Sequence, residues 1–335
     1  MIAQLDPLYV KTRPAKAVSR LVSYALFEGR PITTRGQWIN PLVFAHFALE
    51  MRLPQLKRVE KPIFVVGTGR SGSTILGVLM SMHRDVGFLN EPKAMWHAAY
   101  PRADVFGQHW KGPARYPLGE EDASKEVRRR MRRLFGAYSR AVAAKRVVDK
   151  HPELVFRIPF VRAIFPDARF VLLVRNGWDT CRSIDGWSKR KGTRQKGETH
   201  DWWGADNRKW RLMLEQLVPR EESLAHVEQE VRGLDRHADM AAVEWIVTMR
   251  EGLRQRRSNE DCVHLIRYES LVDHPRRELS SLLEFCELPH DEVFLRFAEQ
   301  RVSPVPSGGP FDLHPAIRPS FEETMRLLGY QDASP

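Results

Sequence analysis

A short segment rich in glycine and hydroxyl side chains is the part of this sequence best suited to chemistry. It reads Gly67-Thr-Gly-Arg-Ser-Gly-Ser-Thr74 and nearly matches the phosphate-binding pattern G-x-x-x-x-G-K-[ST], except that Ser73 occupies the lysine position. Glycines let the backbone turn tightly, so that N–H groups and the start of the following helix can form a nest for a tetrahedral anion. The segment therefore predicts an anion-binding loop.

The side chains of this loop are also suited to holding an anion. Serine and threonine hydroxyls can donate hydrogen bonds, and an arginine can place its guanidinium on an anionic oxygen. The candidate binding residues of the loop are Arg70, Ser71, Gly72, Ser73 and Thr74.

The strand and helix on either side must position this loop. Residues 63–66 form a continuous apolar run, which is typical of a buried parallel strand, and residues 74–82 form a helix that is apolar almost all round. Further strands are predicted at 86–89, 146–149, 169–174 and 263–266. The pattern predicts an α/β domain with a P-loop-like parallel sheet flanked by helices.

The remainder of the chain divides by its hydrophobic periodicity. Residues 1–60 predict a helical N-terminal arm, residues 61–300 the α/β domain with a helical insertion at about 200–256, and residues 301–335 an irregular C-terminal tail. Residues 188–201 lack a hydrophobic period and predict a mobile loop. Long helices are predicted over 125–144, 153–165, 206–232, 238–255 and 275–286.

The requirements of ATP and GTP chemistry are poorly met. A P-loop enzyme of that kind needs an aspartate at a strand end to hold Mg²⁺. The clearest strand ends in Arg175 instead, and Asp149 is a weak substitute. Sulfuryl transfer tolerates these differences, because a sulfonate carries less negative charge than a phosphoryl group and fixed cations with N–H dipoles can stabilise it. We predict no metal site.

Several segments resemble the sulfotransferases that use 3′-phosphoadenosine 5′-phosphosulfate (PAPS). The loop resembles the family's 5′-phosphosulfate loop, in which Lys or Arg precedes x-G-[ST]-[ST]; here that residue is Arg70. The stretch from Phe165 to Gly177 resembles the family's 3′-phosphate motif, whose strand-end Arg and helical Ser correspond to Arg175 and Ser183. The resemblance implies that PAPS is the co-substrate and that Arg70 also acts in catalysis.

A further segment, residues 82–92, resembles the H-x-D-V … E-P pattern of the carbohydrate and tyrosylprotein branches. The resemblance implies that Glu91 is the general base that removes the acceptor hydroxyl proton. His97 and His109 remain alternative bases, because cytosolic small-molecule sulfotransferases use a histidine. Lys150 lies in a segment similar to the family's K-x-P motif, where it would reach the cofactor or would be a plain surface lysine.

The resemblance runs from about residue 61 to residue 289. It includes a Y-E-x-L segment that begins at Tyr268 and to which we assign no chemistry. The family's C-terminal cofactor element is not recognisable, and the segment Ser307-Gly-Gly309 is only a guess at its replacement. The tryptophans at 178, 187, 202 and 203 could stack on adenine or a sugar, or pack in the core.

The function implied is transfer of a sulfuryl group from PAPS to a hydroxyl of a glycan, a tyrosyl side chain or a natural product, with release of adenosine 3′,5′-bisphosphate. Two alternatives stay open: a P-loop kinase, and a non-catalytic binder of nucleic acid or another polyanion. The basic run at 128–133 suits the second alternative, but a solvated helix face is the favoured interpretation. We therefore expect no nucleic-acid partner.

The composition indicates the kind of partner and the cellular compartment that suit this protein. The chain has 53 Lys+Arg against 42 Asp+Glu, a net charge of +11, which favours an anionic partner. Its three cysteines have wide spacing and no C-x-x-C pattern, which favours a reducing compartment, the cytoplasm. Neither a signal peptide nor a membrane span is predicted. The basic helical arm leaves weak membrane-surface contact open, although packing on the main domain is favoured. The oligomeric state is not predicted.

Overall fold

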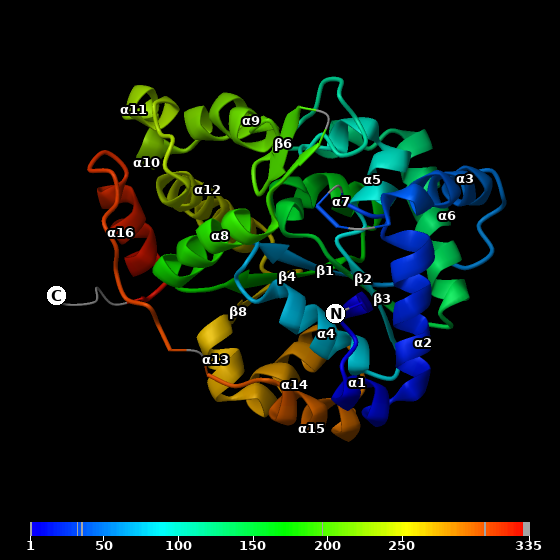
Figure 1. Cartoon of the computed structure of the whole chain (residues 1–335). Coiled ribbons are helices and arrows are strands. Elements are labelled where there is room, and N and C mark those ends of the chain that lie inside the picture. Colours follow the sequence, from blue (N-terminus) through cyan, green and yellow to red (C-terminus); the bar gives the residue numbers. More distant parts are fainter. Residues whose placement is uncertain (1, 32, 35, 196, 305, 331–335) are drawn as a thin grey trace.

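The computed structural model describes residues 2–31, 33–34, 36–195, 197–304 and 306–330. Its centre is a five-stranded sheet in which every pairing is parallel, in the order β2-β3-β1-β4-β8 (Figure 1). The strands are β1 (Ile63–Gly67), β2 (Val86–Asn90), β3 (Arg146–Lys150), β4 (Arg169–Val174) and β8 (Val263–Arg267). The predicted α/β fold with a parallel sheet flanked by helices is confirmed.

The order of the strands determines where a ligand can bind. After β1 the chain continues to β2 and β3 on one side, and then crosses to β4 and β8 on the other. The direction therefore reverses between β1 and β4, which are paired along their whole length. Open α/β sheets bind ligands at the carboxyl ends of strands that flank such a reversal. The glycine loop follows β1, so it lies at this point.

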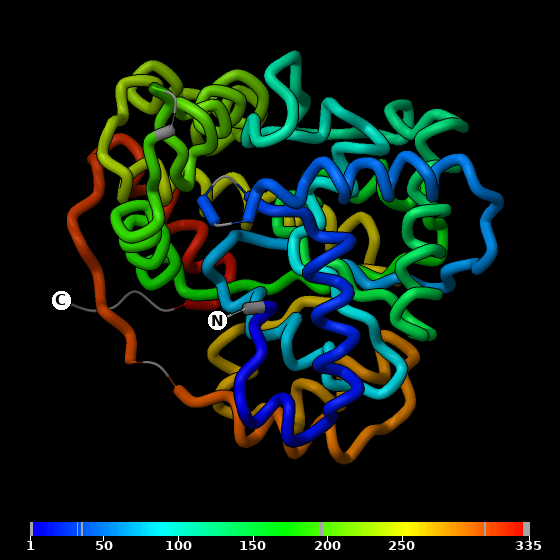
Figure 2. The backbone as a smooth tube through the Cα atoms, turned by 45° about the vertical axis from the view of Figure 1, so that its right-hand side comes forward, coloured from blue at the N-terminus to red at the C-terminus, as the bar shows by residue number. Residues whose placement is uncertain are grey.

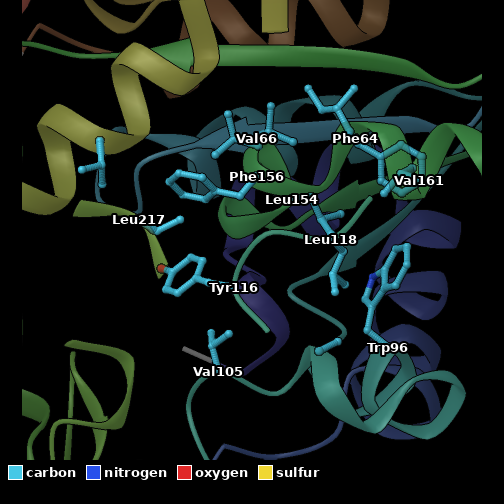
Figure 3. Packing of buried hydrophobic residues seen from close by; sticks show 14 of the residues in the cluster. Phe64, Val66, Trp96, Val105, Tyr116, Leu118, Leu154, Phe156, Val161 and Leu217 are labelled. Carbon is cyan, nitrogen blue, oxygen red and sulfur yellow. The ribbon is translucent and has the colours of Figure 1, made fainter. Parts of the chain in front are cut away.

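Two apolar cores cover the two faces of the sheet, because side chains alternate along each strand. On β1, Ile63 and Val65 pack on one side, together with α4 (Ser73–Met82), α14 (Pro275–Phe285) and α15 (Glu292–Arg301). Phe64 and Val66 point to the other side, into the larger core (Figure 3). All five residues of β1 are buried, which explains the continuous apolar run.

The other helices surround this sheet (Figure 1). They are α1 (Pro7–Thr12), α2 (Pro14–Val22), α3 (Asn40–Glu50), α5 (Lys93–Ala99), α6 (Lys125–Ala141), α7 (Ile158–Ile164), α8 (Gly177–Lys191), α9 (Arg208–Gln216), α10 (Glu222–Ala225), α11 (Glu228–Arg232), α12 (His237–Ser258), α13 (Tyr268–Asp273) and α16 (Arg318–Leu327).

The N-terminal arm packs on the domain, and Figure 2 shows it in blue in front of the domain. The hydroxyl of Tyr9 is 2.8 Å from that of Ser81, and Arg13 forms a bidentate ion pair with Asp291 at 2.6 Å. Further along the arm, Phe27 joins the larger core. The arm is thus tied to the domain by polar and apolar contacts at several points.

Several of the predicted elements are wrong. Residues 188–201 do not form an irregular loop: α8 continues to Lys191, and β5 (Thr193–Gln195), β6 (Glu198–Asp201) and β7 (Gly204–Ala205) form a small antiparallel sheet. The strands are too short to show a hydrophobic period. The single helix predicted over 206–232 is divided into α9, α10 and α11. Pro219 lies in the 3-10 turn Val218–Arg220, which separates α9 from α10.

The prediction of an irregular C-terminal tail over residues 301–335 is wrong for part of that segment. Residues 318–327 form α16, which packs against α12. Ile317, Phe321, Met325 and Leu328 are all buried and lie three or four residues apart, which is the spacing of a helical face. Pro319 is compatible with this helix because it lies in the first turn, where its absent N–H has no partner to lose.

Exposed apolar side chains gather on the arm. Of the large apolar residues that are exposed in the described chain, eight lie between residues 10 and 56, and the other two are Trp110 and Leu327. Contact of the arm with a membrane surface stays a prediction.

Among the described helices, none combines the length and apolar character that a membrane span requires. The three cysteines are buried and unpaired, and the cytoplasmic location predicted from them stays a prediction.

A buried ion pair within the arm, which also forms hydrogen bonds to β2, yields a stability prediction. Glu28 accepts hydrogen bonds from Arg20 at 2.7 Å and from the backbone N–H of Asn90 at 2.8 Å, and Arg20 is only 2% exposed. Glu28→Gln would leave the Arg20 charge buried without its carboxylate. We expect the free energy of unfolding, measured by urea denaturation, to fall by about 3–5 kcal/mol.

The control is Glu322→Gln, which removes an exposed pair with Arg318 in α16. A pair of this kind contributes about 0.3–0.5 kcal/mol. Equal effects of the two substitutions would contradict the structural role given to Glu28.

Candidate functional site

The shape of the glycine loop depends on close contacts that only glycine permits. Gly67 has φ of +136°, and a Cβ there would lie 2.6 Å from the carbonyl oxygen of Leu173. Gly72 precedes α4 with φ of +93°, and a Cβ there would lie 2.2 Å from the ring of Tyr268. The loop therefore lies directly against β4 and the start of α13.

The loop presents unused donors at the start of α4. In the described chain, the backbone N–H groups of Ser73 and Thr74 make no hydrogen bond to protein, as is usual in the first turn of a helix. The hydroxyl of Ser71 is already engaged, because it donates to the carbonyl of Thr68 at 2.6 Å and is buried. Ser71 thus stabilises the loop, while Ser73 and Thr74 face a cavity.

Three of the predicted site residues come together although they are far apart in the sequence. Nε of Arg70 donates to the hydroxyl of Ser183 at 3.2 Å, and Nη1 of Arg175 donates to the carbonyl of Arg70 at 3.2 Å. Arg175 stands just beyond β4, and Ser183 lies two turns into α8. The Nε of Arg175 is buried and has no partner in the described chain, so a donor remains for a ligand.

Two cavities meet at Arg70. The first, which we call the arginine cavity, has a volume of about 370 Å³ and is lined by Gln4, Arg70, Gly72, Ser73, Thr74, Ile75, Val78, Arg175, Ser183, Tyr268 and Arg301. The second, the glutamate cavity, has a volume of about 330 Å³ and includes Glu91, Lys93, Lys150, Trp187 and Trp202 in its lining. Arg70, Ser73 and Thr74 border both cavities. A group held by the loop would therefore be reachable from either side.

Positive charge at Arg70 is only partly balanced. Burial lowers the pKa of Arg70, and the nearby guanidinium groups of Arg190 and Arg175 lower it further, while Glu91 opposes them. In the described chain neither Arg70 nor Arg175 forms an ion pair with a carboxylate. An anion in the arginine cavity would relieve this repulsion.

Glu91 follows β2 in a backbone conformation that is unusual for a non-glycine residue, with φ of +52°. Its N–H donates to the carbonyl of Lys150 at 2.8 Å, so that its side chain lies at the same edge as the loop. The carboxylate pairs with Lys150 and, at 2.9 Å, with Lys93. Burial would raise the pKa of Glu91, but the two ammonium groups outweigh burial and hold the pKa well below its ordinary value.

The alternative bases differ in position. His109 lines the glutamate cavity, and burial lowers its pKa to about 4. His97 does not line the cavity, and burial lowers its pKa as well. The loop that carries His109 is held by Asp104, whose carboxylate accepts four backbone N–H groups. His109 is therefore the better placed of the two histidines.

Trp202 forms one wall of the glutamate cavity and also touches the loop. A Cβ at Gly69 would lie 2.4 Å from its ring. Its indole N–H donates to Glu244 at 2.6 Å, and Glu244 also pairs at 2.6 Å with Lys209, which is fully buried. This ion pair between α9 and α12 fixes the ring. The sequence suggested Trp202 for stacking, but Glu244 and Lys209 were not identified from the sequence as its support.

Tyr268 and Glu269, to which we assigned no chemistry from the sequence, help to position Arg175. The Arg175 guanidinium lies 4.6 Å from the centre of the Tyr268 ring, which also contacts Gly72. Glu269 accepts the N–H of Asn176 at 2.9 Å. The two residues at the start of α13 thus position the arginine at the end of β4.

The segment Ser307-Gly-Gly309 lies elsewhere. Gly308 donates its N–H to Asp179 at 2.9 Å, and Arg182 donates to the carbonyl of Gly309 at 3.0 Å. The segment therefore contacts the exposed side of α8, and none of its residues lines either cavity. Closure over a nucleotide by this segment stays a guess.

Asp149 is poorly placed to hold a metal ion. It is fully buried in β3, and one of its oxygens accepts a hydrogen bond from the indole N–H of Trp96 at 2.8 Å. Within the described ranges, no three His, Cys, Asp or Glu side chains are grouped as a metal site would require.

Comparisons with known proteins bear on the family and the fold of this chain. A family model described as the sulfotransferase family matches residues 62–292. A protein-tyrosine sulfotransferase of Drosophila melanogaster is 25% identical over 245 residues, which cover 71% of this chain and 40% of the relative. Nodulation protein NoeE of Sinorhizobium fredii is 26% identical over 242 residues, covering 70% and 51%. The chain thus spans about half, or less, of the length of these curated relatives.

A solved structure shares the fold. Sulfotransferase STF9 from Mycobacterium avium superposes with a TM-score of 0.50 at 12% identity, over 100% of this chain and 90% of that one. The region matched by the family model includes Arg70, Glu91, Arg175 and Ser183, whereas the arm lies outside it.

The buried carboxyl of Asp149 yields a prediction of pH dependence. Burial raises its pKa to about 8, whereas in the unfolded chain it titrates near an ordinary value of about 3.9. Between these values the unfolded state is ionised and the folded state is not, so wild-type stability falls as pH rises. Asp149→Asn cannot ionise and retains an acceptor for Trp96.

We therefore expect the variant to gain stability relative to wild type between pH 5 and pH 8. Urea denaturation at pH 5, 6.5 and 8 measures this difference. A difference that stays constant with pH would show that Asp149 does not remain protonated in the fold.

Proposed function

The chain belongs to the sulfotransferase family, and from that premise we propose that it transfers the sulfuryl group of PAPS to an acceptor hydroxyl and releases adenosine 3′,5′-bisphosphate. One observation carries the proposal. Arg70, Arg175 and Ser183 converge on one cavity beside a glycine loop in which serine stands in place of lysine. Fixed cations and N–H donors can hold a phosphosulfate and a second phosphate without that lysine.

The arginine cavity fits the two anionic ends of PAPS. The 3′-phosphate would take the free Nε of Arg175 and the hydroxyl of Ser183. The phosphosulfate would take the N–H groups of Ser73 and Thr74, with the Arg70 guanidinium on a sulfonate oxygen. When bound, PAPS supplies an electrophilic sulfur with a phosphate leaving group. The loop holds and orients these groups, and positioning supplies a large part of the acceleration.

The glutamate cavity suits the acceptor. Glu91 is ionised at neutral pH and 34% exposed, so it can accept a proton from a hydroxyl that enters the cavity. Lys150 is buried beside it and can donate toward the sulfonate side. Trp187 and Trp202 form an aromatic wall, with ring centres 5.5 Å apart. A hydroxyl on a glycan, a tyrosyl side chain or an aromatic natural product is compatible with this lining.

The two alternatives receive less support. A kinase would use a loop lysine and a strand-end aspartate for Mg²⁺, but Ser73 replaces the first and Asp149 is buried. A polyanion binder would use a free basic stripe. In the run at 128–133, Arg129 and Arg130 pair with Glu126, while Arg132 donates to a carbonyl of the protein. The arginines that we have named on this helix face therefore already have partners within the protein.

Nucleotide binding tests the donor site. Arg175→Ala should weaken binding of adenosine 3′,5′-bisphosphate, measured by calorimetry, by about 10- to 150-fold, since a charge-assisted hydrogen bond contributes about 1.5–3 kcal/mol. Ser183→Ala should weaken it less, by about 2- to 10-fold, because the hydroxyl donates one hydrogen bond and carries no charge of its own. Lys189→Ala serves as the control, because this exposed lysine lies on the same helix, outside both cavities.

ATP with Mg²⁺ is titrated in parallel and should bind more weakly to wild type than the bisphosphate does. Tighter binding of ATP with Mg²⁺ would favour the kinase. Unchanged bisphosphate affinity in both alanine variants would refute the 3′-phosphate assignment.

Catalysis tests the acceptor side. With labelled PAPS and a panel of phenolic and sugar acceptors, Glu91→Gln should lower kcat by about 10²- to 10⁴-fold, because the amide cannot accept the proton. Bisphosphate affinity should change little, since Glu91 does not line the arginine cavity. His109→Gln is the comparison. If His109→Gln abolishes turnover while Glu91→Gln keeps it, the base is the histidine.

A further inference from the structure

The charged side chains that line the glutamate cavity are almost all paired with one another. Each carboxylate in the described lining has a cationic or N–H partner: Glu28 with Arg20, Glu91 with Lys93 and Lys150, Glu153 with Lys93 and His151, and Asp201 with the N–H of Trp203. Two lining arginines form no ion pair with a described carboxylate. One is Arg70, which the proposed function assigns to the sulfonate. The other is Arg30, in the N-terminal arm.

Arg30 is held rigidly. Its guanidinium carbon lies 3.2 Å from the centre of the Tyr24 ring, so the two planes are in contact. Asn40 accepts the backbone N–H of Arg30 at 2.8 Å and donates to its carbonyl at 2.9 Å. Asn40 therefore holds the backbone of Arg30, while the Tyr24 ring supports its guanidinium.

The segment that carries Arg30 is itself fixed on the domain. Gly29 has φ of +69°, and a Cβ there would lie 2.6 Å from the Cβ of Ala94 in α5. Glu28 accepts the N–H of Asn90 at the end of β2. Because Asn90 directly precedes Glu91, these contacts fix Arg30 relative to the residue assigned as the base.

The hydrogen-bonding capacity of Arg30 is mostly unused. A guanidinium has five N–H donors, and in the described chain only Nη1 donates, to the carbonyl of Gly29 at 2.9 Å. Arg30 is nevertheless only 6% exposed. A buried charge without a counter-ion is costly, and burial lowers the pKa of Arg30. Arg30 is one of the residues that line the glutamate cavity.

We propose that Arg30 binds a carboxylate on the acceptor, so that the enzyme sulfates a hydroxyl of an acidic molecule. This inference rests on the proposed function, because it takes the glutamate cavity as the acceptor site. A guanidinium that stacks on one face keeps its in-plane donors free, and these match the two oxygens of a carboxylate. The arm, outside the region matched by the family model, thus contributes acceptor specificity.

Binding of matched acid and amide probes tests the proposal without turnover. The enzyme, with and without saturating adenosine 3′,5′-bisphosphate, is titrated calorimetrically with 4-hydroxyphenylacetate against 4-hydroxyphenylacetamide, and with glucuronate against glucuronamide. In at least one pair, wild type should bind the acid about 10- to 100-fold more tightly than the amide. Arg30→Gln should reduce that preference to less than about threefold, and Arg30→Lys should leave an intermediate preference, because it keeps charge but loses the planar fork.

The control variant is Arg52→Gln, the same substitution at an exposed arginine of the arm that lines neither cavity. It should keep the wild-type preference. Circular dichroism and bisphosphate affinity, both expected to be unchanged in Arg30→Gln, show that the variant is folded.

Three results would overturn the proposal: no acid preference of wild type in either pair, a preference retained by Arg30→Gln, or a loss of bisphosphate affinity in Arg30→Gln, which would place Arg30 at the donor. Failure of wild type to bind the bisphosphate would instead count against the proposed function. The titrations without nucleotide would still show whether Arg30 recognises a carboxylate.

Discussion

Two arginines held in contact without a carboxylate between them are the constraint on which this site depends. Arg175 donates to the backbone of Arg70, and no described carboxylate pairs with either guanidinium. The arrangement persists because the pairing of β1 with β4 brings their carboxyl ends together, whatever follows each strand. Tyr268 then supports the Arg175 guanidinium with its ring, and Gly72 permits that ring to approach. The fold thus holds two guanidinium groups close together without a carboxylate partner. Their positive charge favours the binding of an anion at this place.

At the same edge of the sheet, a second group of charged side chains is fully paired. Glu91, Lys93, Lys150 and Glu153 form a connected network in which charges are balanced internally. Such a network costs desolvation but fixes the position of each side chain, provided that every member is paired. Arg70 lies between the two regions and borders both cavities. Arg70 therefore lies between a cavity that needs an anion and a network of four side chains whose charges are already balanced.

The sequence allowed the loop, the parallel sheet and the placement of Arg175 and Ser183 beside one cavity to be predicted, because each has a recognisable pattern within a short segment. The support of Trp202 could not be predicted in this way, since Glu244 and Lys209 meet only through the packing of α9 against α12. A signal did exist: Glu244 interrupts an apolar stretch of α12, where a buried carboxylate requires a partner. The residues around Glu244 do not indicate which distant residue is its partner. For the same reason, the small sheet at 193–205 and the burial of Arg30 emerged only from the structure.

The low pKa of Glu91 is at first sight poorly suited to a base, because a weakly basic carboxylate removes a hydroxyl proton with little driving force. The cause of the low pKa resolves this difficulty. It comes from Lys150 and Lys93, and Lys150 is the closer partner. Any anionic oxygen that enters between the loop and Lys150 competes with Glu91 for that ammonium group, and the pKa of Glu91 then rises. Under the proposed function, the base would therefore gain basicity only when the donor is in place, which couples proton removal to the presence of both substrates.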